Sequence, residues 1–480
     1  MFEWIRNLFS GKEEDIVSAM SIMQDYFLND PGTSNLRKKI IVPPTPKKLN
    51  FVVKGHSGPA PLGTAKGQAM SCHITLANCI NYMQSMIGQF RKPIDRWAHT
   101  QTLHVDPRAG KQFNAYYNRN CLKFFFSKAR NAKKIIYTAD SADIVAHELG
   151  HAILDSLKPN MFHVQGLELW AFHESFADIT AILSVMQHNE IMQKALKQTK
   201  GDLMRPNVIS KIAEQVGNAI FSISRGRDGR KPGSIRDATD VFIYQNPKKL
   251  PQKAPVNELA RESHSFGRVF LGAWYQLMVE IYNKNIADKM GNRIECLSSA
   301  RDTAARYVLK SVVRVPSTAQ FLEAIAKGMI VADKEEGGKY SEILDRVFTY
   351  RNLIQPRVRM MSNTDWNDIR KNLQKDDQVV GHKNGLVAKL SRPRTLRLSD
   401  HLASSLSDCN PLYDVEVEVP ADSYYEFNQD GILVDEVLPN EEEIIMSTAL
   451  CLDTIFTEDS VGSDKMWEVQ DNKLIRAFIE

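Results

Sequence analysis

The chain has 480 residues, of which 43% are apolar and 25% are charged, the balance of a folded globular protein rather than a disordered or fibrous one. At roughly 100–200 residues per domain, this length allows several domains. The net charge of +4 divides unevenly, because residues 401–480 hold 19 Asp and Glu against 3 Lys and Arg and sum to −16, which leaves +20 on residues 1–400. The acidic end is therefore expected to form a unit of its own.

The composition and the first residues also bear on location. No stretch approaches the roughly 20 consecutive apolar residues of a membrane helix, so we expect no membrane span. Residues 1–10 are amphipathic, but Glu3 and Arg6 interrupt what would be the apolar region of a signal peptide. A cytoplasmic location, or export by a non-classical route, is expected. The six cysteines form no CxxC pair, which argues against a disulfide scaffold and against a cysteine zinc site.

The predicted elements of the first half begin with one amphipathic helix over residues 12–29. The proline- and glycine-rich segment that follows cannot sustain a helix and marks a boundary near residue 65. Apolar residues at helical spacing predict a core helix over 68–90. Residues 114–118 and 122–126, which flank a polar turn, predict a β-hairpin.

Two strong helix patterns follow at 141–157 and about 168–188, and the sequence then remains mostly helical to about residue 355. The next segment is basic and polar and is interpreted as a connector. Alternating valines and glutamates, an Asp-Gly turn and an acidic helix start predict a small α+β module at the end of the chain. The expected units are an N-terminal extension (1–65), a core (66–355), a basic linker (356–400) and an acidic α+β module (401–480).

The motif His-Glu-x-x-His lies at residues 147–151, inside the helix predicted over 141–157. On a helix, His147 and His151 lie one turn apart on the same face, so two imidazole nitrogens can reach one ion, with Glu148 beside it. The motif therefore predicts one zinc ion bound by His147 and His151.

A catalytic zinc needs a third protein ligand and an open position for water. Glu174 lies 23 residues after His151 on the next predicted helix, and Asp178 follows it by one turn on the same face. We predict that Glu174 binds the ion and that Asp178 accepts the free ring N–H of a ligand histidine, with His147 as the expected partner. Glu168 is the alternative third ligand, although no acid follows it one turn later.

The motif and its Glu-x-x-x-Asp continuation resemble the thermolysin-like gluzincin metallopeptidases. The metzincin continuation is absent, since Leu154 and Leu157 stand where its Gly and His would be. Three further matches occur in the order of that family, and the resemblance covers about residues 68–340. They are Asn114-Ala115-Tyr116-Tyr117, similar to the substrate-binding edge strand; Gly233-Ser234-Ile235-Arg236, similar to the segment with the substrate-binding arginine; and Ser263-His264-Ser265-Phe266-Gly267, similar to the segment with the transition-state histidine.

This resemblance implies an α+β, two-lobed peptidase core, with a mixed α/β N-lobe (66–158), a mainly helical C-lobe (159–355) and a cleft between them. It implies zinc-dependent hydrolysis of a peptide or protein substrate, in which zinc acidifies its bound water and Glu148 takes the proton. By the same resemblance, His264 stabilises the oxyanion and Arg236 binds a substrate carbonyl. Asn114 and Ala115 bind the peptide backbone by strand addition.

Several residues depart from the family pattern. His173 precedes the third ligand in place of Asn, and no tyrosine in the segment between His151 and Glu174 can serve as a second oxyanion donor. Asp143 matches a calcium ligand of the family, but Val185 stands where a partnering acid is expected, which argues against calcium. His73, His104, His163 and His173 are interpreted as ordinary polar or packing residues.

These departures keep alternatives open. The chain is otherwise a catalytically weak or inactive zinc protein that binds peptides, or a zinc hydrolase of a non-peptide amide. His264 is alternatively a helix-start residue, and Arg236 part of a basic surface loop. Residues 1–65 are interpreted as an inhibitory segment or an adaptor.

The uneven charge suggests a contact within the chain. No basic motif interleaved with aromatic residues and no zinc-finger spacing is present, so nucleic acid is not an expected partner. We expect instead that the acidic module docks on the basic core of its own chain.

Overall fold

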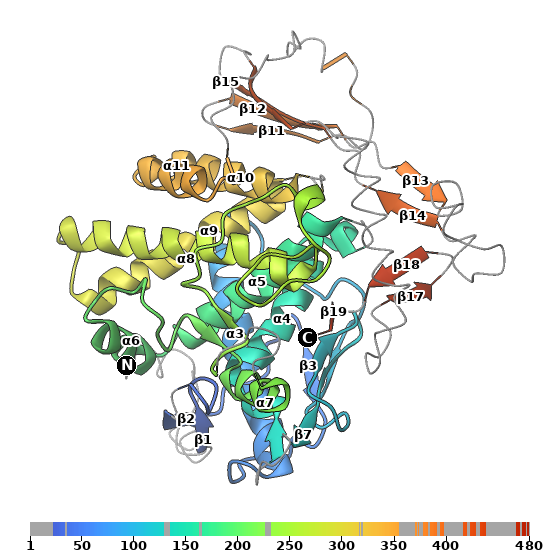
Figure 1. Ribbon diagram of the computed structural model, residues 1–480, viewed down its shortest axis with the longest axis vertical. Helices are drawn as coiled ribbons and strands as arrows, with labels where there is room; N and C mark the ends of the chain where they lie inside the picture. Colours follow the sequence, from blue (N-terminus) through green and yellow to red (C-terminus); the bar gives the residue numbers. More distant parts are fainter. Residues whose placement is uncertain are drawn as a thin grey trace, which may run out of the picture.

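The computed structural model is a mixed α+β protein (Figure 1). It describes residues 23–354 except for 34–35, 129–134, 163–165, 226–231, 316 and 318–319, and beyond them residues 370, 371 and 373 and nine strands. The prediction of the α+β class is confirmed. In the described part of the chain, no helix is both long and apolar enough to cross a bilayer.

The main sheet has five strands in the order β19-β5-β6-β4-β3. Strands β3, β4 and β6 are parallel to one another, whereas β5 is antiparallel to β6, and β19 to β5. The β5–β6 pair confirms the predicted hairpin. The bounds are Phe51–Val53 (β3), Leu103–Asp106 (β4), Ala115–Tyr117 (β5), Cys121–Phe124 (β6) and Phe478–Ile479 (β19).

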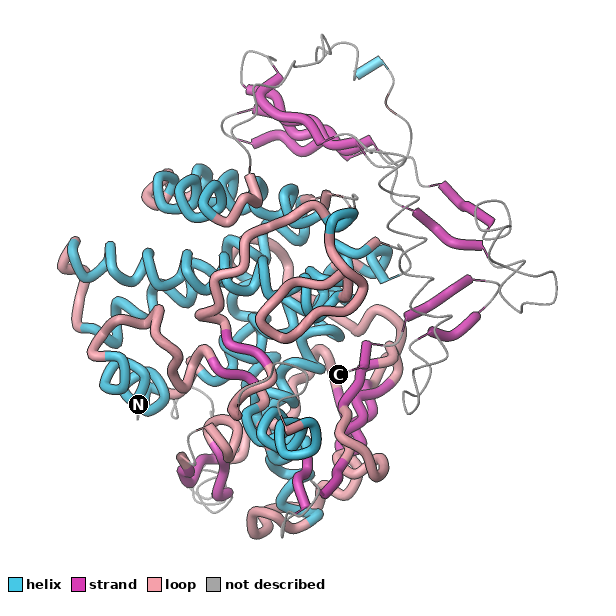
Figure 2. Tube along the Cα trace, in the orientation of Figure 1, coloured by secondary structure: helices cyan, strands magenta, loops and turns pink. Residues whose placement is uncertain are grey.

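Three helices lie at the centre of the molecule: α3 (Ala65–Gly88), α4 (Ala142–Leu157) and α5 (Leu167–Val185). They match the helices predicted at 68–90, 141–157 and 168–188. Nearly every residue of α4 and α5 is buried, so these helices form the core rather than cover it. Figure 2 shows this helical centre beside the magenta strands of the main sheet.

Two glycines allow the central helices to approach closely. A Cβ at Gly150 of α4 would lie 2.7 Å from the Cα of Ala177 on α5, and a Cβ at Gly267 would lie 2.7 Å from the carbonyl oxygen of Ala171. Because Cβ atoms essentially never come this close to other atoms, any larger residue would push the helices apart. The glycine within the His-Glu-x-x-His motif thus sets the distance between the two helices.

The remaining helices complete the body and confirm the helical sequence predicted up to about residue 355. They are α6 (Asn189–Thr199), α7 (Glu214–Ser224), α8 (Ser263–Ala287), α9 (Arg293–Arg314), α10 (Phe321–Glu335) and α11 (Ser341–Tyr350), with short 3-10 helices η1 (Thr138–Asp140), η2 (Pro159–Phe162) and η3 (Pro247–Lys249). Two-stranded sheets join β1 (Met23–Phe27) to β2 (Arg37–Ile41), β7 (Phe126–Lys128) to β8 (Ile135–Tyr137), and β9 (Lys211–Ile212) to β10 (Arg236–Asp237).

The N-terminal segment differs from its prediction. Where the sequence predicts the end of a helix at 12–29, residues 23–27 form β1, because alternate residues of this strand are buried against the core and its backbone pairs with β2. Residues 1–22 lie outside the described residues. Strand β3 also comes from the segment 1–65 and belongs to the main sheet, so this segment contributes to the core.

The C-terminal strands form two four-stranded sheets, β11-β12-β15-β16 and β13-β14-β18-β17. Both sheets combine strands from the basic segment 356–400 with strands from the acidic segment 401–480, so the boundary at residue 400 runs through them. The helical part predicted near residue 440 lies outside the described residues. The bounds are Gln378–His382 (β11), Gly385–Leu390 (β12), Arg394–Arg397 (β13), Glu416–Val419 (β14), Ser423–Asn428 (β15), Leu433–Val437 (β16), Trp467–Gln470 (β17) and Lys473–Arg476 (β18).

Candidate metal centre

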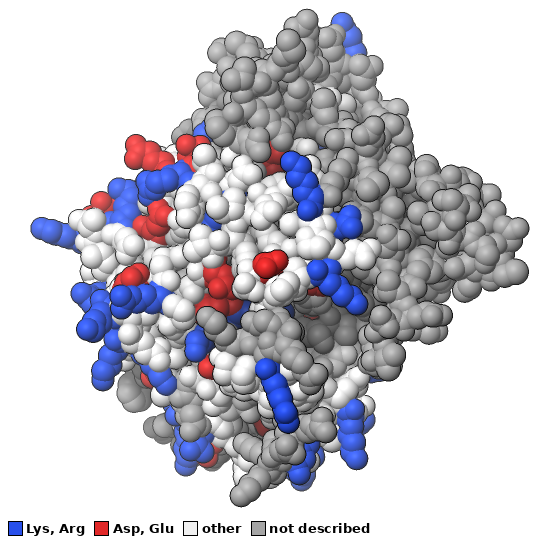
Figure 3. All heavy atoms as spheres, in the orientation of Figure 1, with Lys and Arg blue, Asp and Glu red and all other residues white. Residues whose placement is uncertain are grey.

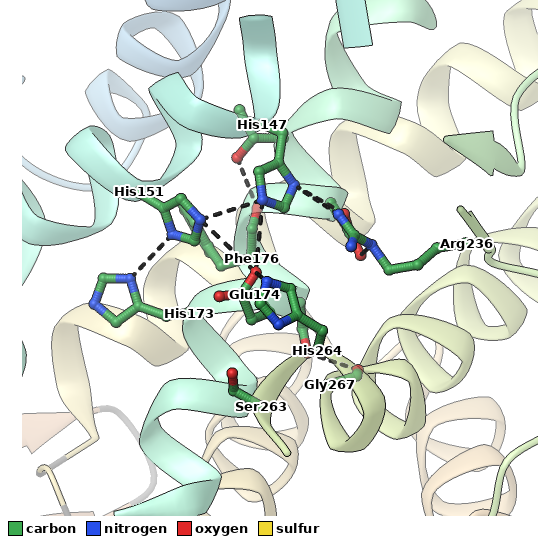
Figure 4. Close-up of polar contacts among 12 residues, drawn as sticks. His147, His151, His173, Glu174, Phe176, Arg236, Ser263, His264 and Gly267 are labelled. Carbon is green, nitrogen blue, oxygen red and sulfur yellow. Dashed lines mark hydrogen bonds and ion pairs between the residues drawn. The ribbon is translucent and has the colours of Figure 1, made fainter. Parts of the chain in front are cut away.

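Helices α4 and α5 bring the three predicted metal ligands together (Figure 4). His147 Nε2 lies 3.2 Å from His151 Nε2 and 3.6 Å from Glu174 Oε2, and His151 Nε2 lies 3.9 Å from the same oxygen. All three side chains are buried. This group could hold one metal ion.

The spacing and the chemistry of these groups fit such an ion. Ligand atoms about 2.0–2.1 Å from a tetrahedral zinc lie about 3.3 Å apart, close to the separations of the three ligand atoms here. The two carboxylate oxygens of Glu174 are buried and accept no hydrogen bond from the described residues. A buried carboxylate without hydrogen-bond donors is costly, so a cation is its natural partner. The geometry leaves the identity of the metal open.

The protonation states of the ligands also suit a cation. Burial lowers the pKa of His151 well below its usual value, so its imidazole is neutral and has a lone pair to donate. Burial opposes the charge on Glu174, but His264, His147 and His151 outweigh burial and hold the pKa of this carboxyl well below its usual value. Two imidazoles and one carboxylate are an ordinary ligand set for a catalytic zinc.

Asp178 orients His147, as the sequence predicts. Its Oδ1 lies 2.8 Å from His147 Nδ1, so the ring N–H donates to the carboxylate and Nε2 faces the ligand cluster. Arg236 pairs with the other oxygen of this carboxylate, with Nε 2.7 Å from Oδ2. The Arg236 Nη2 atom is also 3.5 Å from His147 Nδ1, which is a contact rather than a hydrogen bond because that nitrogen already donates to Asp178.

His151 has an outer partner that the sequence reading did not assign. Its Nδ1 lies 3.4 Å from Nδ1 of His173, a fully buried residue on α5, and Figure 4 shows the two rings facing each other. His173 is not among the three residues that could hold a metal ion, but its buried ring contacts one of them. Its position next to Glu174 in the sequence was the available signal.

His264 lies at the same centre, at the start of α8. Its Nε2 is 3.4 Å from Glu174 Oε2, and its Nδ1 is 2.6 Å from Glu262 Oε1. Burial opposes a charge on this imidazole, but Glu174 and Glu262 outweigh it and raise the pKa of His264 above its usual value. Burial also opposes ionisation of Glu262, yet His264 and two backbone N–H groups lower the pKa of Glu262 to about 2.

Glu262 is a second residue that the sequence reading missed. It caps α8 by accepting the backbone N–H groups of His264 and Ser265. An acid immediately before a helix is a common cap, and this alone would not have indicated a function. The structure shows that the same carboxylate also holds the His264 ring.

The two candidate glutamates on the central helices lie in different surroundings. Glu148 is buried on α4 between the two ligand histidines in sequence. Glu168, the alternative third ligand, accepts hydrogen bonds from Tyr244 Oη at 2.7 Å and from Leu322 N–H at 2.9 Å. Among the described residues, the group that could hold a metal ion contains Glu174 and not Glu168.

A cavity of about 350 Å³ adjoins this centre. Its wall includes Arg236, Glu262 and His264, together with the exposed loop residues Gln252 and Lys253. The cavity places room for a ligand beside the two predicted substrate-contacting side chains.

The remaining predicted residues lie on the main sheet. Asn114 and Ala115 are buried at the start of β5, and Asn114 Oδ1 accepts the N–H of Ala115 at 2.8 Å. The carbonyl of Asn114 accepts the N–H of Phe125, the residue that follows β6. Both residues are thus backbone elements of the sheet beside α4 rather than members of the ligand cluster.

Asp143, which matches a calcium ligand of the family in sequence, is hydrogen-bonded to protein groups. Asp143 accepts the N–H groups of Ile144 and Ala213 at 2.8 and 2.7 Å and also contacts the Ser141 hydroxyl, which bridges to Asp30. These bonds give Asp143 a structural role in joining the N-terminal segment to α4.

Charge on the described surface is mixed. On the face drawn in Figure 3, Lys and Arg side chains are scattered, with Asp and Glu among them. The described residues on this face form no single continuous basic patch. The comparisons with known proteins add no identification, since no family model matches the chain and no curated protein matches it.

Proposed function

We propose that this chain is a zinc-dependent endopeptidase of the thermolysin-like kind. The observation that carries the proposal is the convergence of His147, His151 and Glu174 beside His264. The carboxylate of Glu174 accepts no hydrogen bond from the described residues. Under this proposal, the main sheet with α3 and α4 forms the N-lobe and the helices from α5 onward form the C-lobe. Glu148 acts as the general base.

The metal, when bound, would acidify a water molecule and polarise the scissile carbonyl. His147, His151 and Glu174 would hold it, and Asp178 fixes the tautomer of His147 through the 2.8 Å contact at Nδ1. Glu148 would take a proton from the attacking water and deliver it to the leaving amine, since it follows the first ligand on the same helix.

His264 is suited to stabilise a developing oxyanion. Because Glu262 holds its Nδ1–H, its Nε2 is directed toward Glu174 and the centre. Its raised pKa favours the protonated ring, which donates from Nε2 as well. Arg236 Nε pairs with Asp178, and Arg236 lines the wall of the cavity, where its guanidinium would bind a substrate carbonyl.

A second candidate is a zinc protein that binds peptides with little or no turnover. It is favoured by Phe162, which lies in the segment where the family has a donor tyrosine and packs between Tyr117 and His173. A phenyl ring cannot donate a hydrogen bond to an oxyanion, so this side of the site lacks that contribution.

One experiment separates the two candidates. The purified chain is analysed for bound zinc and then incubated with unstructured casein, with and without 1,10-phenanthroline. We expect about one zinc per chain and cleavage that stops with the chelator and returns with added zinc. Stoichiometric zinc without cleavage would favour the peptide-binding protein, and absence of bound zinc would contradict both candidates.

A further inference from the structure

Strand β5 is the outermost strand that the central part of the chain contributes to the main sheet. It pairs on one side with β6, and its other side pairs only with β19 in the described sheet. Strand β19 comes from the distant segment Phe478–Ile479, and Figure 1 labels it at the edge of the sheet. The edge of β5 is therefore covered by a distant part of the same chain.

The backbone of β5 offers its polar groups to that covered side. Asn118 N–H donates to Cys121 and Phe125 N–H donates to Asn114, so the even-numbered residues 114 and 118 direct their groups toward β6. Because backbone groups alternate between the two sides of an antiparallel strand, Ala115 and Tyr117 direct theirs away from β6. These are the groups that an added strand would bind.

The register shows how the occupant uses this edge. Phe478 stands opposite Tyr117, and Ile479 stands opposite Tyr116. Since Tyr117 directs its N–H and C=O outward, Phe478 is in the hydrogen-bonding pair, and the N–H of Ile479 points away from β5. The occupant runs antiparallel to β5, as an added peptide strand can.

The same strand is connected to the metal centre through side chains. Tyr117 Oη donates to Asp155 on α4 at 2.9 Å, and the Tyr117 ring lies 6.1 Å from that of Phe162. Phe162 in turn lies 5.9 Å from His173, which contacts His151. A chain bound along β5 would thus lie on the scaffold that positions the ligand helix.

We propose that the segment 478–479 is a resident occupant of the outer edge of β5 and that a peptide must displace it in order to bind along this strand. The inference rests on the proposed function for the nature of the ligand, a peptide. The proposed hydrolysis does not require the segment 478–479 on this edge. Its presence there is a feature of this chain.

The length of the contact makes displacement feasible. The paired segment has two residues, and each backbone hydrogen bond contributes only about 0.5–1.5 kcal/mol net. An incoming peptide that pairs along all three residues of β5 would make more such bonds. While the occupant is bound, the apparent affinity for a peptide falls in proportion to the fraction of open edges.

Two proline variants of the full chain test the proposal. Phe478→Pro removes the N–H that pairs with Tyr117, whereas Ile479→Pro, one residue along, removes an N–H that points away from β5 and serves as the matched control. Both are made in the Glu148→Gln background, so that binding is read without turnover. Hydrogen exchange of the Tyr117 amide and anisotropy of fluorescein-labelled casein are measured.

We expect faster exchange at Tyr117 and about 3–10-fold tighter casein binding for Phe478→Pro, with parental values for Ile479→Pro. Added casein should restore protection of Tyr117 in Phe478→Pro. Unchanged exchange, or unchanged casein affinity, in Phe478→Pro would overturn the proposal. Displacement of the occupant by casein in these variants, together with no cleavage of casein by the chain that retains Glu148, would contradict the proposed peptidase function alone.

Discussion

Helices α4 and α5 each contain a buried carboxylate, and the two differ in the hydrogen bonds that they accept. Asp155, near the end of α4, accepts hydrogen bonds from Arg119 Nε and Nη2 at 3.0 Å each and from Tyr117 Oη at 2.9 Å. Glu174, on α5, is equally buried but accepts none from the described residues and faces three imidazoles. Protein groups satisfy the first carboxylate, whereas the second belongs to the group that could hold a metal ion.

Burial of an acid is therefore a poor indicator of function, and the set of groups around it is a better one. Asp143 belongs with Asp155, because backbone N–H groups and Ser141 surround it. Burial raises the pKa of Asp155, and the contacts with Arg119 and Tyr117 oppose that shift. The comparison predicts different consequences when each kind of site is altered.

The largest expected effect is on turnover, after a substitution at the candidate metal centre. Glu148→Gln removes the proposed base but leaves His147, His151 and Glu174 in place, so turnover of casein should fall by about 10²–10⁴-fold while bound zinc stays at the parental level. Kinetics and metal analysis of the same preparation measure both. Glu342→Gln, an exposed position on α11, is the control and should behave as the parent. Turnover retained in Glu148→Gln would refute the assigned base.

At the buried pair of Arg119 and Asp155, the expected effect is on the free energy of unfolding rather than on metal binding. Arg119→Met leaves the buried Asp155 without its cation and should lower the free energy of unfolding by about 3–5 kcal/mol in urea titrations. Replacing Asp155 with Asn in the same chain should recover part of this loss, because the unpaired charge is then gone.

The control for this pair is a similar pair at the surface. Lys54 is 76% exposed and bonds Asp106 at 2.8 Å, so Lys54→Met should cost no more than about 1 kcal/mol. Equal losses for Arg119→Met and Lys54→Met would show that burial does not set the strength of these pairs.

The third test uses pH. Burial, with Asp143 as a neighbour, raises the pKa of Asp30 to about 7, so the folded chain keeps this proton to a higher pH than the unfolded chain does. The contribution of Asp30 to stability is therefore complete below about pH 4, falls by up to about 1.4 kcal/mol per unit between about pH 4 and 7, and changes no further above.

Asp30→Asn should remove this part of the pH dependence, measured as urea denaturation at pH 5 and pH 8. Asp25→Asn, an exposed position on β1, controls for the loss of one charge. If Asp30→Asn and the parent lose the same stability between these two pH values, the pKa of Asp30 is not raised in the folded chain.

The sequence predicted the helices, the hairpin and the three side chains that could hold a metal ion because each depends on local spacing. His147 and His151 follow from helical periodicity, and the acid one turn after Glu174 indicated Asp178 as the partner of His147. What the sequence could not predict are pairings between distant segments, because periodicity carries no information about which strand joins which.

Two corrections show this limit. Strand β1 lies within a segment whose apolar spacing also suits a helix, and its pairing with β2 decided the outcome. Strand β19 joins β5 across most of the chain, and nothing in either segment specifies the other. The contact between His173 and His151 could not be predicted for a related reason, since only the packing of α5 on α4 brings the two rings together.

The smallest expected effect concerns that outer histidine. His151 directs Nε2 to the ligand cluster and Nδ1 to His173. With a metal on Nε2, the Nδ1–H of His151 would donate to His173, which would then fix the tautomer of His151. His173→Leu removes the acceptor while keeping an apolar side chain in a buried position, and it should weaken zinc binding by about 10–100-fold in a competition with a chelator. His173→Asn keeps an acceptor oxygen at this position and should restore most of the affinity. Because both variants alter packing, an equal loss of affinity in the two would assign His173 to packing, whereas a loss confined to His173→Leu would identify it as a positioning residue.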